Sequence, residues 1–382
     1  MKIPVDLQIK KILKNTNRII IKLGTRVIDD PKVHFNKPVV EGIVKQIAEL
    51  KNSGKEIVLV TSGAVGAGIR AMELKKRPDS VTERQALAAI GQSRLMFLYK
   101  ELFREKGIKV AQLLLTRTDF EDRERYLNVR TTMETILKWG IIPIVNENDT
   151  VAIEELTFGD NDMLSALIAG KLDADVLLLL TDVKGLYNKP PKKGNKAKLL
   201  KVVDKITSEI ESLAGGTGSE ISLGGMKSKV VAAKTATSSG VLVGLGMGKK
   251  KGIIEDFLDG KPAGTWFLPN SRRLSARKKW IVFGKRASGG GVEIDPGAVK
   301  AIQKDNKSLL PSGVTRVFGE FNEKDLIIIE DKNGKEIARG LVNYNAETLR
   351  SIIGMKTGEI KKHFPGRKEY EIINRDDLVL TI

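Results

Sequence analysis

The stretch Ile19-Ile20-Ile21-Lys22-Leu23-Gly24-Thr25 indicates the fold of the first part of the chain. An apolar run of strand length ends there in a lysine and a glycine. Further apolar runs of similar length follow, separated by segments with helical spacing. These runs are Ile57–Val60, Val110–Leu115, Ile141–Val145, Val176–Leu180 and Val241–Val243. Strands that alternate with helices form a mostly parallel sheet with helices on both faces. We therefore expect an α/β fold, a three-layer sandwich, over residues 17–268.

The clearest helical segment extends from Glu83 to Arg104, because leucine and isoleucine recur in it at spacings of three to five residues. Its apolar side chains could pack in the core or form an interface between copies of the chain. In an open parallel sheet, ligands bind beyond the carboxyl ends of the strands. The polar motifs described below lie at or just after such ends, which predicts one shared site.

The composition excludes several kinds of site and protein. The chain of 382 residues has no cysteine and two histidines, so disulfides, thiolate nucleophiles and cysteine- or histidine-based zinc sites are excluded. The longest apolar runs are far shorter than the roughly 20 residues that a membrane helix needs. The lysine-rich start has no signal-peptide core, so we expect a cytoplasmic protein without a membrane partner. The net charge of +18 is compatible with a generic basic surface, anionic substrates or nucleic acid.

Two turns rich in glycine could hold an anion. The first is Lys22-Leu23-Gly24-Thr25, where a glycine past a strand end allows close approach of a phosphate and a lysine adds positive charge. The second is Thr61-Ser62-Gly63-Ala64-Val65-Gly66-Ala67-Gly68, which follows a strand and is expected to open a helix. A surface lysine before a turn, and a tight strand–helix connection, are the structural alternatives.

Two clusters of carboxylates and amides follow, Asn146-Glu147-Asn148-Asp149 and Gly159-Asp160-Asn161-Asp162. Such groups could bind an ammonium group, hold lysines in place or lie near Mg²⁺. Hydrated turns or helix caps are the alternative. A last pair of motifs comprises Leu180-Thr181-Asp182 and Gly224-Gly225-Met226-Lys227-Ser228-Lys229. The second of these lies in a predicted loop, Ala214–Lys229, and could surround a polyphosphate; Lys189–Lys201 is a second predicted loop.

Taken in this order, the motifs resemble those of the amino-acid kinase family. Thr61-Ser62-Gly63-Ala64, Lys22–Thr25 and Glu121–Arg125 are most similar to the branch whose members phosphorylate glutamate. The resemblance implies ATP-dependent phosphorylation of the L-glutamate side-chain carboxylate to L-glutamyl 5-phosphate, the first step of proline biosynthesis. A kinase for another acceptor, or an RNA-binding protein with an incidental kinase fold, is the alternative.

The resemblance also implies roles for individual residues. Lys22 and Lys229 would stabilise the transferred phosphoryl group, and Asp162 would hold both lysines. Glutamate would be bound by Ser62, Asp149, Asn161 and Asp160. ATP would be bound by Lys22, Gly24, Thr181, Asp182, Leu223, Gly224, Gly225, Met226, Lys227, Ser228 and Lys229. Mg²⁺ would be held largely by ATP oxygens, since Mg²⁺ in such sites seldom has an all-protein cage.

Further partners follow from the same resemblance. We expect feedback inhibition by L-proline, a homo-oligomer (dimer or tetramer) and a glutamyl phosphate reductase that takes the product. Two positions depart from the family pattern: Leu223 stands where threonine is common, and no Asp-Pro pair occurs at Tyr187–Pro190. Both departures concern contacts with the adenosine.

The pattern changes near Leu268–Lys279, so we expect one domain over residues 1–270 and a small, mainly β domain over residues 278–382. Its expected strands are Lys279–Phe283, Leu326–Glu330, Glu336–Val342, Glu369–Ile373 and Leu378–Ile382, and its expected helices are Pro296–Lys304 and Ala346–Ile353. Gly297–Val299 and Leu309–Val314 resemble a PUA domain, a module that also occurs in RNA-modifying enzymes. RNA binding is one expectation for it, and a role in folding, assembly or regulation is the other.

Overall fold

The computed structural model describes residues 4–29, 35–151, 161–189, 197–215, 225–270, 278, 281, 289–366 and 370–380. The chain divides into two compact units. The larger comprises residues 1–119 and 124–273, and the smaller comprises residues 120–123 and 274–382. We describe each unit by itself.

The larger unit is built on an eight-stranded sheet with the order β3-β4-β2-β1-β5-β7-β8-β6. Its centre is β1 (Arg18–Leu23), which pairs in parallel with β2 (Glu56–Val60) and β5 (Val176–Thr181). The remaining strands are β3 (Val110–Leu115), β4 (Ile142–Glu147), β6 (Val202–Val203), β7 (Leu242–Met247) and β8 (Gly264–Phe267). Only β8 runs antiparallel to its neighbour β7 among these described pairings. The predicted mostly parallel sheet is confirmed.

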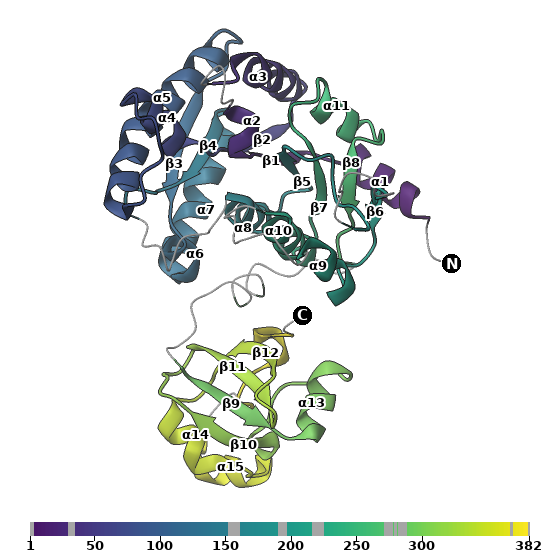
Figure 1. The fold of residues 1–382 in the computed structure, drawn as a ribbon. Coiled ribbons are helices and arrows are strands. Elements are labelled where there is room, and N and C mark those ends of the chain that lie inside the picture. The colour runs from purple at the N-terminus through teal and green to yellow at the C-terminus, as the bar shows by residue number, and fades with distance from the viewer. Residues whose placement is uncertain are drawn as a thin grey trace. The chain divides into compact units, whose positions relative to one another are not determined.

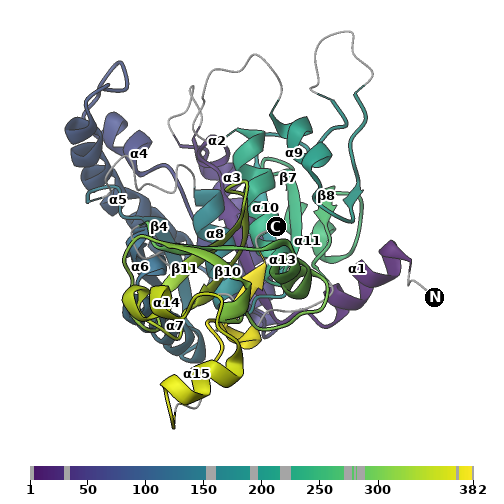
Figure 2. The same cartoon turned by 90° about the horizontal axis from the view of Figure 1, so that it is seen from below.

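Helices cover both faces of this sheet, as predicted. Figure 1 shows α3 and α11 on one side of it and α8 and α10 on the other. The helices of the first half are α1 (Val5–Lys14), α2 (Thr25–Ile28), α3 (Lys37–Asn52), α4 (Ala64–Ala71), α5 (Val81–Arg104), α6 (Thr118–Glu121) and α7 (Arg123–Lys138). Those of the second half are α8 (Asn161–Lys171), α9 (Ser208–Ala214), α10 (Met226–Ser238) and α11 (Ile253–Leu258). Figure 2 shows α8 and α10 side by side as well.

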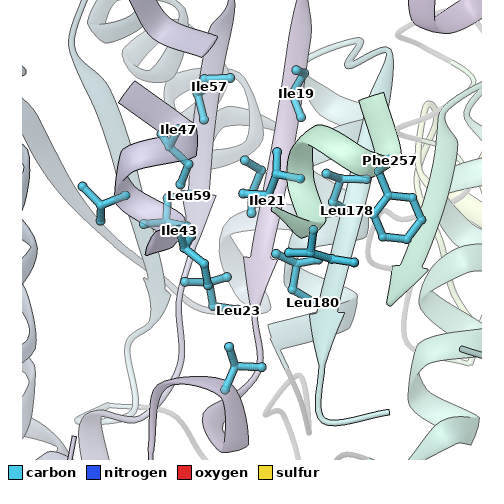
Figure 3. Close-up of a cluster of buried hydrophobic side chains, with 14 of the residues drawn as sticks. Ile19, Ile21, Leu23, Ile43, Ile47, Ile57, Leu59, Leu178, Leu180 and Phe257 are labelled. Atoms are coloured by element: carbon cyan, nitrogen blue, oxygen red, sulfur yellow. The ribbon is translucent and has the colours of Figure 1, made fainter. Parts of the chain in front are cut away.

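The core follows from the alternation of side chains along β1. Ile19, Ile21 and Leu23 point to the same face because the side-chain period of a strand is two residues. Figure 3 shows them against side chains of α3 and α11, among them Ile43 and Phe257. All five residues are almost completely buried. This packing holds β1 in the middle of the sheet, so that Lys22, which points to the opposite face, is fixed at its carboxyl end.

The smaller unit contains a five-stranded sheet with the order β10-β9-β11-β12-β13. Its strands are β9 (Gly291–Ile294), β10 (Val314–Phe318), β11 (Leu326–Asp331), β12 (Glu336–Leu341) and β13 (Leu378–Leu380). Its longer helices are α13 (Pro296–Gln303), α14 (Ala346–Ile352) and α15 (Thr357–His363), and short 3-10 helices lie at Pro311–Gly313 and Arg375–Asp377. The core combines both layers, since Ile327 and Ile329 of β11 and Leu349 of α14 belong to one cluster of buried side chains.

Several predictions for this unit need correction. The strands β9 and β10 and the helix α15 were not predicted. The strand expected over Glu369–Ile373 is wrong in its described part, residues 370–373, where only Ile373 forms an isolated bridge, with Leu309. Most of the strand expected over Lys279–Phe283 lies outside the described residues, and Ile281 within it is helical. The remaining predicted strands and helices of the unit are present. No helix in the described part of the chain is long and apolar enough to cross a membrane.

Candidate active site

A cavity of about 510 Å³ lies beyond the carboxyl ends of β1, β2, β4 and β5. Of the predicted site residues, it is lined by Lys22, Gly24, Ser62, Asp149, Asn161, Thr181, Asp182, Gly225, Met226 and Lys229. Asp162 lies buried below it, and Lys227 is exposed. Asp160, Leu223 and Gly224 fall outside the described residues. The structure therefore gathers most of the predicted residues at one site, while their functional roles stay predictions.

The centre of this site is a carboxylate shared by two lysines. Lys22 Nζ lies 2.5 Å from Asp162 Oδ1, and Lys229 Nζ lies 3.0 Å from Asp162 Oδ2. Asp162 is 1% exposed, Lys22 2% and Lys229 5%. Ser228 Oγ lies 3.3 Å from Asp162 Oδ2 and 2.8 Å from the Gly225 carbonyl oxygen, so its single proton is shared between these two acceptors. Within this cluster two positive charges stand against one negative charge, so the two ammonium groups can attract an anionic group such as a phosphoryl group at this point of the cavity.

Helix starts place two of these three groups. Asp162 is in the first turn of α8, where the helix dipole favours a negative charge. Lys229 is in the first turn of α10, which begins after an extended Gly225. The predicted loop Ala214–Lys229 is therefore wrong for residues 226–229. Helical geometry orients Ser228 and Lys229 toward the same carboxylate, which a flexible loop would not do without loss of conformational entropy.

The turn between β2 and α4 forms another wall of the cavity. Gly63 has a φ of +98°, a left-handed conformation that a residue with a side chain rarely adopts. This turn starts α4 at Ala64 and directs Ser62 into the cavity. The helix predicted to open within this motif is confirmed.

Buried amides connect this turn to α8 and β4. Asn161 Nδ2 donates to the Thr61 carbonyl oxygen at 2.5 Å, to Ser62 Oγ at 3.1 Å and to Asn146 Oδ1 at 2.7 Å. Asn146 Nδ2 in turn donates to Gln92 Oε1 of α5, at 2.8 Å. Gln92 lies in none of the predicted site motifs. The sequence feature that could have identified it is that a polar residue lies on the side of the Glu83–Arg104 helix that carries the leucines.

Two acidic residues of the cavity have shifted pKa values. Burial raises the pKa of Asp149 to about 6, an effect that the positive charge of Arg77 partly opposes. Burial also acts to raise the pKa of Asp182, but hydrogen bonds from Arg26 and Thr181 outweigh it, so this pKa lies below its ordinary value. Arg26 is 2.9 Å from Asp182. Both arginines line the cavity, and neither was predicted as a site residue.

An α/β sheet with two lysines beside a cavity at its strand ends is the arrangement that the motifs predicted for an amino-acid kinase. Comparison with known proteins agrees with this class. The chain belongs to the amino acid kinase family, whose model matches residues 17–243, and a PUA domain model matches residues 290–364. Two similar proteins are named glutamate 5-kinase. One, from Moorella thermoacetica, is 47% identical over 369 residues, which cover 96% of this chain and 97% of the relative. The other, from Thermoanaerobacter sp. (strain X514), is 46% identical over 364 residues, 95% and 97% of the two chains.

Solved structures with a similar fold include the carbamate kinase from Giardia lamblia bound to AMP-PNP. Its TM-score is 0.49 at 17% identity, and the match covers 67% of this chain and 99% of that chain. The family models and the close relatives confirm the resemblance to the amino-acid kinase family and the PUA domain that the motifs predicted.

Proposed function

We propose that this chain is a glutamate 5-kinase. It transfers the γ-phosphoryl group of ATP to the side-chain carboxylate of L-glutamate and releases L-glutamyl 5-phosphate and ADP, as the first step of proline biosynthesis. The arrangement of Lys22 and Lys229 on the buried Asp162 carries the proposal for phosphoryl transfer. The choice of glutamate is supported by relatives of that name, which match this chain over nearly their full length.

The reaction asks little covalent chemistry of the protein. One oxygen of the glutamate side-chain carboxylate attacks the γ-phosphorus in line, and the bond from that phosphorus to the β–γ bridging oxygen breaks. The bond electrons leave with ADP. Because a carboxylate is already an anionic nucleophile, no general base is required. Catalysis then depends on positioning and on neutralising the phosphoryl oxygens, which two fixed ammonium groups provide.

Asp162 prepares the lysines for this task. Since both Nζ atoms are held by one buried carboxylate, their positions do not have to be reorganised when phosphate charge shifts during transfer. We infer that ATP lies along Gly24, Thr181, Asp182 and the start of α10, residues 225–229. The amide donors there suit phosphate oxygens.

Glutamate would lie at the other end of the cavity, near Ser62, Asp149 and Asn161. A carboxylate at Asp149 attracts the ammonium group of an amino acid. Among the described residues, no group of three or more histidine, aspartate or glutamate side chains could hold a metal ion. We propose that Mg²⁺ enters bound to ATP and adds charge neutralisation at the phosphate oxygens.

Several wider features belong to the same proposal. The domain boundaries are 1–270 and 278–382. The protein acts in the cytoplasm as a homo-oligomer, L-proline inhibits it, and a glutamyl phosphate reductase consumes its product, since an acyl phosphate hydrolyses readily. The alternative of RNA binding by the smaller unit is tested by filter binding, because phosphate contacts make affinity fall with salt.

The test is an assay with ATP and L-glutamate in which hydroxylamine traps the acyl phosphate as a hydroxamate. A panel of acceptors, including N-acetylglutamate, aspartate and carbamate, is compared through ADP release. We expect turnover with L-glutamate and little with the others. Absence of glutamate-dependent hydroxamate, or preference for another acceptor, would refute the proposal.

A further inference from the structure

Three buried carboxamides form a hydrogen-bonded chain from α5 to the cavity. Gln92 Oε1 accepts from Asn146 Nδ2 at 2.8 Å, and Asn146 Oδ1 accepts from Asn161 Nδ2 at 2.7 Å. The exposed fractions are 8% for Gln92, 2% for Asn146 and 8% for Asn161. Asn161 and Asn146 line the large cavity, whereas Gln92 does not. Gln92 instead lines a smaller neighbouring cavity of about 210 Å³.

The direction of this chain determines how Asn161 faces the cavity. A carboxamide has nearly the same shape when it is turned by 180°, so only its hydrogen bonds decide which end is the donor. Asn161 Nδ2 is surrounded by three acceptors, the Thr61 carbonyl, Ser62 Oγ and Asn146 Oδ1. Its Oδ1 is buried and has no hydrogen-bond partner within the described parts of the chain. Of the two ends of the Asn161 carboxamide, this oxygen is therefore the one that no described protein group uses.

Asn146 can present its oxygen to Asn161 only while its own amide is held in one orientation. The backbone N–H of Glu147 also donates to Asn146 Oδ1, at 3.0 Å. If Asn146 turned over, two Nδ2 groups would face each other and both of these hydrogen bonds would be lost. The acceptor at the far end, Gln92 Oε1, gives the Asn146 NH₂ group its partner and opposes this rotation.

Backbone contacts fix Gln92 relative to the turn that carries Ser62. A Cβ atom added to Gly91 would lie 1.9 Å from the Ala64 carbonyl oxygen and 2.4 Å from the Gly68 nitrogen. Helix α5 therefore packs backbone to backbone against the first turns of α4. Because Ala64 follows Ser62 and Gly63 directly, Gln92 cannot move closer to the Ser62 turn without a backbone clash.

Gln92 uses only one end of its own amide. Gln92 Nε2 is buried and has no partner among the residues that the structure describes. A buried donor without a partner costs free energy, so core packing alone does not explain a glutamine here. Its oxygen, in contrast, has a partner with ordinary hydrogen-bond geometry.

From these contacts we propose that Gln92 is a positioning residue for the amino-acid substrate. Through Asn146 it keeps Asn161 turned so that Nδ2 holds the Ser62 turn and Oδ1 accepts from the substrate ammonium group. This inference rests on the proposed function, since it assumes an amino acid in the cavity. It adds a determinant of substrate affinity that does not touch the substrate.

The test compares Gln92→Glu with Gln92→Met in steady-state kinetics. The Gln92→Glu side chain keeps a carboxyl oxygen at the same reach and loses the Nε2 donor, and burial favours its neutral carboxylic acid form over the charged one. The Gln92→Met side chain has a similar shape and no carbonyl. We expect Gln92→Met to raise the KM for L-glutamate about tenfold, which corresponds to about 1.4 kcal/mol, the typical scale of one buried hydrogen bond. In Gln92→Met the KM for ATP is expected to change less than about twofold. In Gln92→Glu the KM for L-glutamate is expected to stay within about threefold of the wild-type value.

Ser93→Ala is the matched control. Ser93 is the next residue on α5 and lines the same small cavity, but its hydroxyl donates to the Ile90 carbonyl of its own helix, so its loss should leave both KM values unchanged. If Gln92→Met does not fold, Gln92→Asn replaces it, because it withdraws the oxygen by one methylene and should raise the glutamate KM likewise. Any of three results would overturn the proposal: equal effects of Gln92→Glu and Gln92→Met, an unchanged glutamate KM in Gln92→Met and Gln92→Asn, or a parallel rise of the ATP KM. Failure of the proposed function would show separately, as wild-type protein without glutamate-dependent turnover.

Discussion

Replacement of Asp162 by asparagine tests the central feature of the site. The substitution keeps the shape of the side chain and removes the negative charge that Lys22 and Lys229 share. All three groups are at least nine-tenths buried, so water cannot take the place of the carboxylate. We expect losses in both stability and turnover.

The magnitude follows from the two ion pairs. At an effective dielectric of about 20, a unit-charge pair at about 3 Å has a gross attraction of about 5 kcal/mol, most of which offsets the desolvation of the ions. Removal of one partner from a buried pair typically costs about 3–5 kcal/mol, because the remaining charge is uncompensated. We expect a loss of that size in the free energy of unfolding. Loss of the fixed lysine positions should reduce turnover by about 10²–10³.

Two measurements check this prediction: urea unfolding for stability and hydroxamate trapping at saturating ATP and glutamate for turnover. The matched control is Asp256→Asn, which removes the same charge from a partly exposed pair with Lys250 at 2.7 Å. Exposed pairs contribute roughly 0–1 kcal/mol, so this variant should be nearly as stable as wild type and equally active. If Asp162→Asn behaves like the control in both measurements, the shared carboxylate does not organise the site.

Three further predictions concern single charged groups. Lys229→Ala should lower turnover by about 10²–10³ with a modest change in ATP affinity, and near-normal turnover in initial-rate kinetics would contradict its role. Because burial raises the pKa of Asp149 to about 6, protonation below that pH should weaken the attraction for the substrate ammonium, so kcat/KM for glutamate falls about tenfold per pH unit there. Asp149→Asn should raise the glutamate KM and abolish this dependence; an unchanged KM would refute the contact. Burial also lowers the pKa of Lys171, which lies 3.9 Å from the centre of the Tyr126 ring, from 10.5 to about 7. Between these values the unfolded chain holds a proton that the folded chain lacks, so stability rises with pH by up to about 1.4 kcal/mol per unit, and Lys171→Met should flatten that rise in urea unfolding between pH 7 and 10. An unflattened rise would assign it to other groups.

Local patterns determined much of the larger unit. The apolar runs at Ile19–Ile21 and Val176–Leu180 were recognisable as strands because a strand buried on both faces needs apolar residues at every position. In the structure they pair with each other. The strand β8 (Gly264–Phe267) was missed, since its four residues include a glycine and follow Pro262 closely. In the smaller unit, β9 begins at Gly291 after two more glycines and has the composition of a turn. Pairing with β10 and β11 makes it a strand, and pairing is a tertiary effect.

The sequence by itself determined which chemical groups the site contains and that they follow strand ends, because residue types and turn glycines are local properties. Only the tertiary structure decided the distances. Lys22, Asp162 and Lys229 are far apart along the chain and meet because β1, α8 and α10 are packed in one unit. The same applies to Gln92, which has no motif of its own. Its contact with Asn146 exists because the fold brings α5 next to β4 at this point, and no pattern within a single segment encodes a meeting between two segments.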